Sequence, residues 1–377
     1  MSFNRPIKIK KVEALPVRAS GGVSPNMALG LMPTRPALLV RIDDDQGCHG
    51  WGEVWANFPP RANLHKTHLI EDVIAPRLEG FTFTEPEEVD GFLRSKLSTY
   101  FLHVGQLQVF EHVLAGIDIA LWDLALRSAG STFAAHMGLD DASAACYASS
   151  INPPDLERLM LQHADWGQSL FKLKIGFDDD ADRDFVEKAS SIRPAGTSIM
   201  LDNNQTWDRP HAESMLKSLE EFDPLFSEEP IPANSGLDEW EQLAKATSIP
   251  LAGGENIYGV DEFLRMAGAG LKYVQPDVAK WGGVSGALKL SNRLPSGVAL
   301  WPHFMGTAVG QMAALSIAAA VGESTTCEMD VNENPLRTDL CGDVLNIDNG
   351  RVALPGEPGL VAPPVAERLE EFREVAG

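Results

Sequence analysis

The chain has 377 residues, 44% of them hydrophobic and 22% charged, a composition typical of an ordinary soluble protein with room for two domains. Its formal net charge of −22 argues against a nucleic-acid partner, because phosphate binding depends on clustered Lys and Arg side chains. The four cysteines show no close metal-type spacing and the N-terminus lacks the apolar core of a signal peptide, which favours a cytoplasmic location.

The first part of the chain predicts strands followed by helices. Residues 7–17 and 36–54 alternate apolar and polar side chains as strands do, and the run DDDQG at 43–47 is turn-forming. Helical patterns follow at 63–79, 85–97 and 107–129, and the last of them has a continuous apolar stripe. This order predicts an α+β domain over residues 1–138.

From about residue 144 short apolar runs alternate with helix-like segments, the pattern of βα units and a parallel sheet. The runs are ACYASSI, FKLKIGF, SIMLDNNQ, PLFSEEP, PLAGGEN, LKYVQPD, VALWPHF and TTCEMD. Polar residues at their ends recur roughly every 25 residues, the length of one strand and one helix. We expect a TIM-type (β/α) barrel over 139–330, with these polar residues gathered at its mouth. The apolar stretch 308–321 is too short to span a membrane and is expected to be a buried helix.

The chain becomes turn-rich after Asp330 and ends in a predicted helix at about 363–375. We expect the segment 331–377 to return to the first domain and complete it.

Three acids, Asp202, Glu228 and Glu255, end three consecutive predicted strands. Carboxylates that meet without a cation raise one another's pKa values, and ligands that are all oxygen suit a hard cation. The pattern therefore predicts a Mg²⁺ site, with Mn²⁺ as a substitute. A single acid at such a junction can instead cap the following helix, and the sequence SEEP leaves Glu228 and Glu229 as alternatives.

Basic residues are expected on both sides of this site. Lys172 and Lys174 lie two apart on one strand and so share a face. At the barrel mouth, near a divalent cation, two such ammonium groups would lower each other's pKa and free one as a base. A solvent-facing strand is the alternative. Asp277 and His303 end the next two strands after Glu255. There the carboxylate would fix the imidazole tautomer. A histidine in the aromatic run WPHF can instead be a core residue. Glu328, on the last strand, is expected to donate a hydrogen bond as a protonated carboxyl.

A lysine base on one side of a metal site and a histidine on the other form a bifunctional acid/base arrangement. Such a site removes a weakly acidic proton next to a carboxylate, because a metal and a hydrogen-bond donor stabilise the resulting dianion. A metal-dependent hydrolase is a weaker reading, since such enzymes use histidine-rich ligand sets. A catalytically idle, ligand-binding barrel is another alternative. Loss of one of five residues would have favoured it, but all five are present: Lys174, Asp202, Glu228, Glu255 and His303.

Over nearly its whole length the chain resembles the enolase superfamily, and within it the mandelate racemase subgroup. The motifs that carry the resemblance are KLK at 172–174, LDNNQ at 201–205, SEEP, GGEN, PDVAKWGG at 276–283 and WPHF at 301–304. The resemblance implies a modified (β/α)₇β barrel, an α+β capping domain built from the N-terminal part and the C-terminal tail, and a symmetric homo-oligomer, from a dimer to an octamer.

The resemblance also implies roles for the motif residues. Lys174 would be the base on one face of the substrate and the Asp277–His303 pair the base on the other. Asp202, Glu228 and Glu255 would bind the metal. Substrate contacts would come from Lys172 and Glu328, at the substrate carboxylate, and from Asn204.

The same residues fit two reactions of a small hydroxy carboxylate that pass through a metal-stabilised enediolate. One is dehydration of an acid sugar to a 2-keto acid, the activity more frequent in the family; the other is racemisation or epimerisation. Specificity is expected in the loops at 20–35 and 50–61, which close over the mouth. In the first, Met27, Leu29, Leu31 and Met32 would give an apolar lining; Arg35 or Arg61 would clamp a distal carboxylate, unless both are ordinary surface residues.

Overall fold

A computed structural model describes residues 3, 5–20, 26–27, 30–31 and 33–374, with only the backbone of 26–27 and 30–31. The N-terminal part forms an antiparallel sheet in the order β5–β4–β1–β6. Its strands are β1 (Ile7–Ser20), β4 (Thr34–Asp44), β5 (His49–Val54) and β6 (Thr82–Phe83), and the short strands β2 (Asn26–Met27) and β3 (Gly30–Leu31) pair with each other. The strands predicted at 7–17 and 36–54 are confirmed.

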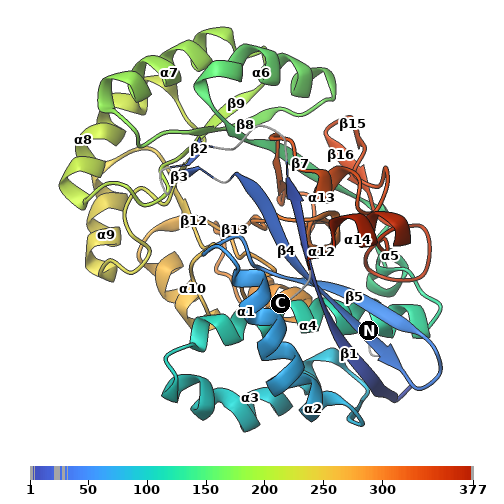
Figure 1. The fold of residues 1–377 in the computed structure, drawn as a ribbon. Coiled ribbons are helices and arrows are strands. Elements are labelled where there is room, and N and C mark those ends of the chain that lie inside the picture. The colour runs from blue at the N-terminus through green and yellow to red at the C-terminus, as the bar shows by residue number, and fades with distance from the viewer. Residues whose placement is uncertain (1–2, 4, 21–25, 28–29, 32, 375–377) are drawn as a thin grey trace.

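Helices cover this sheet on one side, as Figure 1 shows for α3 and α4. The predicted helix at 63–79 is a continuous run with a π-helical turn in its middle. The helices are α1 (Ala62–Leu69), the π turn η1 (Ile70–Ile74), α2 (Ala75–Leu78), α3 (Pro86–His103), α4 (Leu107–Ser128) and α5 (Phe133–Met137). Helix α4 lies directly on β5 because Gly52 has no side chain: a Cβ there would lie 2.1 Å from the Gly116 carbonyl oxygen. This close contact fixes the position of the residues that follow β5.

Eight strands from Ser143 onward form the barrel, and all eight predicted runs contain one. They are β7 (Ser143–Ile151), β8 (Leu170–Lys174), β9 (Ser198–Asp202), β10 (Ser227–Glu228), β11 (Leu251–Gly253), β12 (Leu271–Val274), β13 (Ala299–Leu300) and β14 (Cys327–Asp330). Neighbouring strands from β7 to β13 pair in parallel, and β14 pairs in parallel with β7. Glu328 N donates to Pro302 O at 3.2 Å, so the chain after β13 contacts β14 and closes the ring.

Seven helices connect the barrel strands and surround them (Figure 1). They are α6 (Leu156–Asp165), α7 (Asp179–Ile192), α8 (Arg209–Leu219), α9 (Leu237–Ala246), α10 (Val260–Gly268), α11 (Gly283–Ser291) and α12 (Ala308–Val321), with short 3₁₀ turns η2 (Pro153–Asp155) and η3 (Glu220–Phe222). Seven helices between eight strands make the modified (β/α)₇β barrel that the family resemblance implies. The apolar stretch 308–321 is the buried helix α12; within the described ranges no helix is long and apolar enough to cross a bilayer.

The chain returns from the barrel to the N-terminal sheet, as predicted. The elements are α13 (Pro335–Thr338), β15 (Ile347–Asp348), β16 (Arg351–Ala353) and α14 (Ala366–Phe372). Strand β16 first adds to the barrel sheet, antiparallel to β7. The chain then reaches β1, where Glu374 N donates to Pro16 O at 2.9 Å. The terminal helix is shorter than the predicted 363–375.

A layer of large side chains fills the barrel interior below its mouth. Tyr147, Met200, Phe226, Ala252 and Trp301 pack together there, away from the main core. Because side chains alternate along a strand, the next side chain that points inward lies two residues closer to the strand's carboxyl end, above the apolar layer, where it can be polar. On β9, Met200 lies in this layer and Asp202 lies above it. The apolar layer is thus the floor on which a polar site sits.

Candidate active site

Strand β8 turns its two lysines into the barrel. Phe171 and Leu173 belong to the main hydrophobic core and face the surrounding helices, so the alternate residues Lys172 and Lys174 face inward. Lys172 is fully buried and Lys174 is 4% exposed. The alternative of a solvent-facing lysine pair is therefore wrong.

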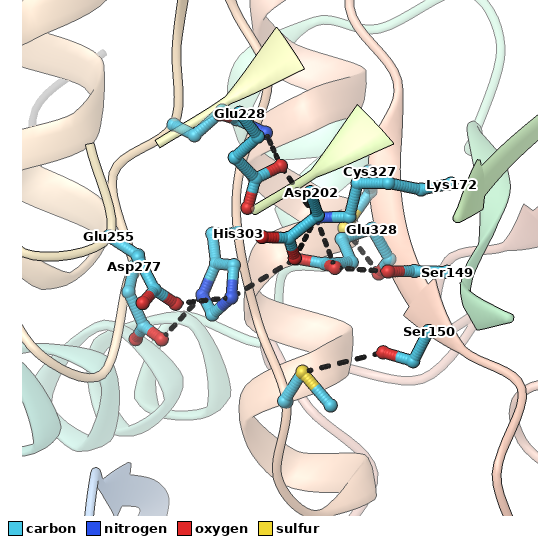
Figure 2. A network of polar contacts seen from close by, with 12 residues as sticks. Ser149, Ser150, Lys172, Asp202, Glu228, Glu255, Asp277, His303, Cys327 and Glu328 are labelled. Carbon is cyan, nitrogen blue, oxygen red and sulfur yellow. Dashed lines mark hydrogen bonds and ion pairs between the residues drawn. The ribbon is translucent and has the colours of Figure 1, made fainter. Parts of the chain in front are cut away.

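Lys172 lies between two carboxylates, as Figure 2 shows. Its Nζ is 2.6 Å from Glu228 Oε2 and 2.7 Å from Glu328 Oε1. Burial alone would lower the pKa of the ammonium group, but the carboxylates of Glu228 and Glu328 outweigh burial and hold that pKa well above its ordinary value. Lys172 therefore stays charged and is suited to binding an anion.

Lys174 donates to Asp202 Oδ2 and, at 3.2 Å, to Asn204 Oδ1. The expected lowering of the Lys174 pKa by the neighbouring Lys172 ammonium is present, but the net lowering that would free a base is not. Burial and the Lys172 ammonium do lower the pKa of Lys174, but the facing carboxylate of Asp202 outweighs them and raises it. The sequence pattern contains the two lysines but not which acid each one meets.

The predicted Asp277–His303 pair is present. His303 Nδ1 is 2.8 Å from Asp277 Oδ2, and the other oxygen of Asp277 accepts from the backbone N–H groups of Ala279 and Lys280. These bonds hold the carboxylate so that Nδ1 carries a hydrogen and Nε2 points to the cavity. His303 Nε2 lies 2.8 Å from Glu255 Oε2 (Figure 2).

Glu328 contacts both basic sides of the site. One of its oxygens pairs with Lys172, and the other lies 3.2 Å from His303 Nε2. Burial raises the pKa of Glu328, but Lys172 and His303 outweigh burial and bring it below its ordinary value. The prediction of a protonated Glu328 is therefore wrong here; the ionised carboxylate also accepts from Ser149 Oγ. In turn Glu328 and Glu255 raise the pKa of His303 well above its ordinary value, against the effect of burial.

The three predicted metal ligands all lie inside the barrel mouth. Asp202 ends β9, Glu228 ends the neighbouring strand β10, and Glu255 follows β11. Among the residues that the structure describes, no three His, Cys, Asp or Glu side chains lie close enough together to hold a metal ion. The three acids contact basic groups instead: Asp202 contacts Lys174, Glu228 contacts Lys172 and Glu255 contacts His303.

The charges in this mouth nevertheless fit a cation. Burial raises the pKa of Glu228 to about 7, with Asp202 and Glu328 adding to the rise and Lys172 opposing it. Burial, with the carboxylates of Glu255 and Glu228, raises the pKa of Glu229 to about 8. The acids of the mouth also outnumber the basic side chains around them: the acids are Asp202, Glu228, Glu229, Glu255, Asp277 and Glu328, and the bases are Lys172, Lys174, Lys280 and His303. Oxygen ligands of this kind suit Mg²⁺. Of the two SEEP acids, Glu228 faces Lys172, whereas Glu229 accepts from the side chains of Gln205 and Asn256.

A cavity of about 700 Å³ opens over these groups. Its polar lining includes four residues that the sequence predicts: Lys174, Asn204, Glu255 and His303. Its apolar wall comes from Trp55, Phe58, Pro59, Pro60 and Met305, so the predicted 50–61 loop does reach the mouth.

Lys280 is a lining residue that sequence reasoning missed. Its Nζ lies 3.7 Å from Glu255 Oε2 and 3.2 Å from Asn256 Oδ1. The available signal was its place three residues after Asp277 in PDVAKWGG.

The two arginines proposed for substrate binding are not among the residues that line this cavity. Arg35 is buried and pairs with Asp330 at 3.4 Å, and Arg61 is exposed directly before α1. Of the expected apolar lining in the 20–35 loop, Leu29 and Met32 lie outside the described residues, as do the side chains of Met27 and Leu31. Contact of these residues with a substrate stays a prediction.

A buried lysine supports the cavity wall from the N-terminal part. Lys66 Nζ donates to Trp55 O and lies 2.8 Å from His112 Nδ1, whose ring donates from Nε2 to the Tyr258 hydroxyl at 3.0 Å. Burial lowers the pKa of His112 to about 2, so the neutral ring can accept from the ammonium group. Both Lys66 and Lys280 lie over the Trp55 ring, at 4.9 and 4.7 Å from its centre.

Lys66 should make stability depend on pH. Burial, with a smaller effect of the Lys280 ammonium, lowers its pKa to about 7. Between pH 7 and the ordinary lysine pKa the unfolded chain therefore binds more protons than the folded one, and the free energy of unfolding rises with pH, by up to about 1.4 kcal/mol per pH unit. We expect urea unfolding at pH 7, 8 and 9 to show this extra rise in the wild type and in the exposed control Lys245→Met, and not in Lys66→Met. Parallel curves for Lys66→Met and the wild type would contradict it.

Comparisons with known proteins agree with this geometry. Residues 16–138 match the family model "Mandelate racemase / muconate lactonizing enzyme, N-terminal domain", and residues 155–364 match "Enolase C-terminal domain-like". The chain is 29% identical to an arabinonate dehydratase of Saccharolobus solfataricus, over 86% of this chain and 87% of that protein. It is 27% identical to a D-galactarolactone cycloisomerase of Agrobacterium fabrum, over 90% and 92%.

A solved structure is also similar over nearly the full length. It is a mandelate racemase/muconate lactonizing enzyme from Bordetella bronchiseptica, with a TM-score of 0.89 and 36% sequence identity, covering 98% of this chain and 100% of that one. The relatives are enzymes of the lyase and isomerase types. The chain therefore belongs to the enolase superfamily, within its mandelate racemase/muconate lactonizing enzyme group, and is itself an enzyme of one of these two types.

Proposed function

We propose that the enzyme removes the α-proton of a hydroxy carboxylate in a Mg²⁺-dependent reaction and dehydrates an acid sugar or a related hydroxy acid to a 2-keto acid. The observation that carries this proposal is that Lys174 and His303 line the same cavity, which also contains Glu255 and Asn204. Two basic groups from different strands can thus act on one bound carbon. The dehydratases among the relatives support dehydration as the type of reaction.

The residues divide the work by position. Lys172, held charged between two carboxylates, would bind the substrate carboxylate. Glu328 would hydrogen-bond to that carboxylate only after taking up a proton. Lys174 Nζ, once it has lost its own proton and no longer pairs with Asp202, would take the α-proton. His303, with Asp277 fixing its Nδ1 hydrogen, would hold a proton on Nε2 and deliver it to the departing β-hydroxyl. The apolar wall around Trp55 would exclude water from these transfers.

Asp202, Glu228 and Glu255 would hold the metal, which Mn²⁺ could replace. When bound, the cation would supply Lewis-acid stabilisation of the negative charge that develops on the substrate carboxylate. The ion pairs that these acids now make with Lys174, Lys172 and His303 would rearrange on binding.

Replacing Glu255 with glutamine is expected to weaken Mg²⁺ binding by about tenfold or more, because an amide oxygen replaces a charged ligand. Isothermal titration with MgCl₂ measures the affinity directly, without any substrate. Glu241→Gln, on an exposed face of α9, is the matched control and should leave the affinity unchanged. An unchanged affinity in Glu255→Gln would remove this residue from the proposed ligand set.

Racemisation or epimerisation at C2 is the second candidate, and the same pair of basic groups favours it. In that reaction His303 would return a proton to C2 instead of to a leaving oxygen. A library of acid sugars and simple α-hydroxy acids, incubated with enzyme and Mg²⁺, separates the two. Appearance of a 2-keto acid supports dehydration, whereas a change in optical rotation without loss of the hydroxy acid supports racemisation. Neither change with any member would contradict both.

A further inference from the structure

A short segment of the N-terminal part, residues 53–57, is bonded to both loops that carry the Asp277–His303 pair. Trp55 N donates to Ala279 O at 3.1 Å, on the loop after β12 that carries Asp277. Asn57 Nδ2 donates to Met305 O at 2.9 Å, two residues after His303. The segment lies at the end of β5, where close packing on α4 fixes it.

Glu53 makes the strongest of these attachments. Its carboxylate is 2% exposed and accepts from Thr307 N at 3.0 Å, Thr307 Oγ1 at 2.6 Å and Gly310 N at 2.9 Å. Thr307 is the N-cap of α12, so a carboxylate from β5 satisfies the first N–H groups of a barrel helix. Gly310 leaves room for it, because a Cβ there would lie 2.8 Å from Glu53 Oε2. The loop between His303 and α12 is thereby held at its far end.

The loop that carries Asp277 is held in the same way. Asp118, on α4, accepts from Ser285 N at 3.0 Å and from Ser285 Oγ at 2.5 Å, at the start of α11. The helices that follow the Asp277 and His303 loops therefore both begin on buried carboxylates of the N-terminal part. The Lys174 side of the site differs. There the structure describes hydrogen bonds that stay within the barrel, among Lys174, Asp202 and Asn204.

We propose that Glu53 is a positioning residue for His303: by holding Thr307 and Gly310 it sets the loop that carries the imidazole, and it does so for the His303 side of the site and not for the Lys174 side. The catalytic part of this inference rests on the proposed function. The positioning part does not, because the contacts of Glu53 with Thr307 and Gly310 require no substrate.

Hydrogen–deuterium exchange tests the positioning without a substrate. In Glu53→Gln one acceptor oxygen becomes an amide nitrogen that faces N–H donors, so we expect backbone amides of 303–310 to exchange about tenfold faster. Amides of 170–176, around Lys174, should exchange as in the wild type. Asp123→Asn is the matched control: Asp123 is also fully buried, but its described partners are Trp51, Arg127, Leu360 and Val361. If 303–310 exchange no faster than in the control, the proposal is overturned.

Glu53→Gln can also reduce the yield of folded protein, and Thr307→Val then serves as the second variant. It removes the Oγ1 group that donates to Glu53 and that also accepts from Val309 N at 3.1 Å, and it keeps Glu53 intact. The same pattern of exchange, confined to 303–310, is expected. Equal acceleration around Lys174 would show a general loss of structure and would contradict the positioning role.

The catalytic consequence is a difference between the two faces of C2. The rate of C2 hydrogen removal is measured for an acid found active in the library and for its C2 epimer. The rate that depends on His303 should be about 100-fold lower in Glu53→Gln than in the wild type, the size expected for a misplaced catalytic group. Loss that depends on Lys174 should change little. Equal losses on both faces would overturn this part. If no acid reacts with the wild type, the proposed function fails while the exchange comparison still decides the role of Glu53.

Discussion

Lys174→Ala is expected to lower turnover by about 10²–10⁴-fold, the usual contribution of a positioned proton-transfer group. The Lys174 amino group is buried and reaches the cavity. The other lysines that the structure describes at the mouth are engaged elsewhere: Lys172 lies between two carboxylates, and Lys280 lies beside Glu255. The variant should also lose exchange of the C2 hydrogen in D₂O on the face that Lys174 serves. Steady-state kinetics and proton NMR measure these two losses separately.

Lys188→Ala is the control for this variant, because Lys188 is exposed on α7 and is not among the residues that line the cavity. The control should keep wild-type turnover. Removing Lys174 also leaves Asp202 without its closest ammonium partner, so thermal unfolding of the variant is measured in parallel. Wild-type turnover of folded Lys174→Ala would exclude it as the base.

His303→Asn is expected to lower product formation by a similar factor, about 10²–10⁴-fold, with a different isotopic signature. Asparagine keeps a polar group beside Asp277 but cannot carry a proton from one site to another. If the reaction is a dehydration begun by Lys174, C2 exchange with solvent should persist while the 2-keto acid no longer forms. If it is a racemisation, exchange should persist from one enantiomer only.

His211→Asn provides the comparison for the histidine variant, since His211 lies on α8 and pairs with Asp179 at the surface. It should leave both product formation and exchange intact. Loss of exchange from every substrate in His303→Asn would mean that the two basic groups do not act independently. That result would contradict the assignment of one group to each face.

The order of elements and the inward residues of the barrel could be predicted from the sequence, because both follow from local periodicity. Residues 171 and 173 face the helices and 172 and 174 the interior, as the alternation of a strand requires. A polar residue at the end of each apolar run then reaches the mouth wherever parallel strands close a ring. Asp277 and His303 meet for this reason, at 2.8 Å, although the sequence separates them by 26 positions.

The pairing of charges inside the mouth could not be predicted in the same way. The direction of each pKa shift depends on which acid each base meets, and Lys174 meets Asp202 closely enough to reverse the expected lowering of its pKa. Glu328 is ionised for the same reason, since Lys172 and His303 both reach it. Contacts between the N-terminal part and the barrel are equally hidden: Glu53 and Thr307 are 254 positions apart and belong to no common pattern.

The central claim is that this site removes the hydrogen at C2 of a hydroxy acid, and its most direct test is deuterium uptake. The enzyme is incubated with Mg²⁺ in D₂O with the acid library, and proton NMR follows the C2 signal of each acid. We expect that at least one acid either exchanges C2 hydrogen for deuterium or yields a 2-keto acid, and that the activity disappears in the Lys174→Ala, His303→Asn double variant. Conversion of an acid with its C2 hydrogen fully retained, or unchanged conversion by the double variant, would contradict it.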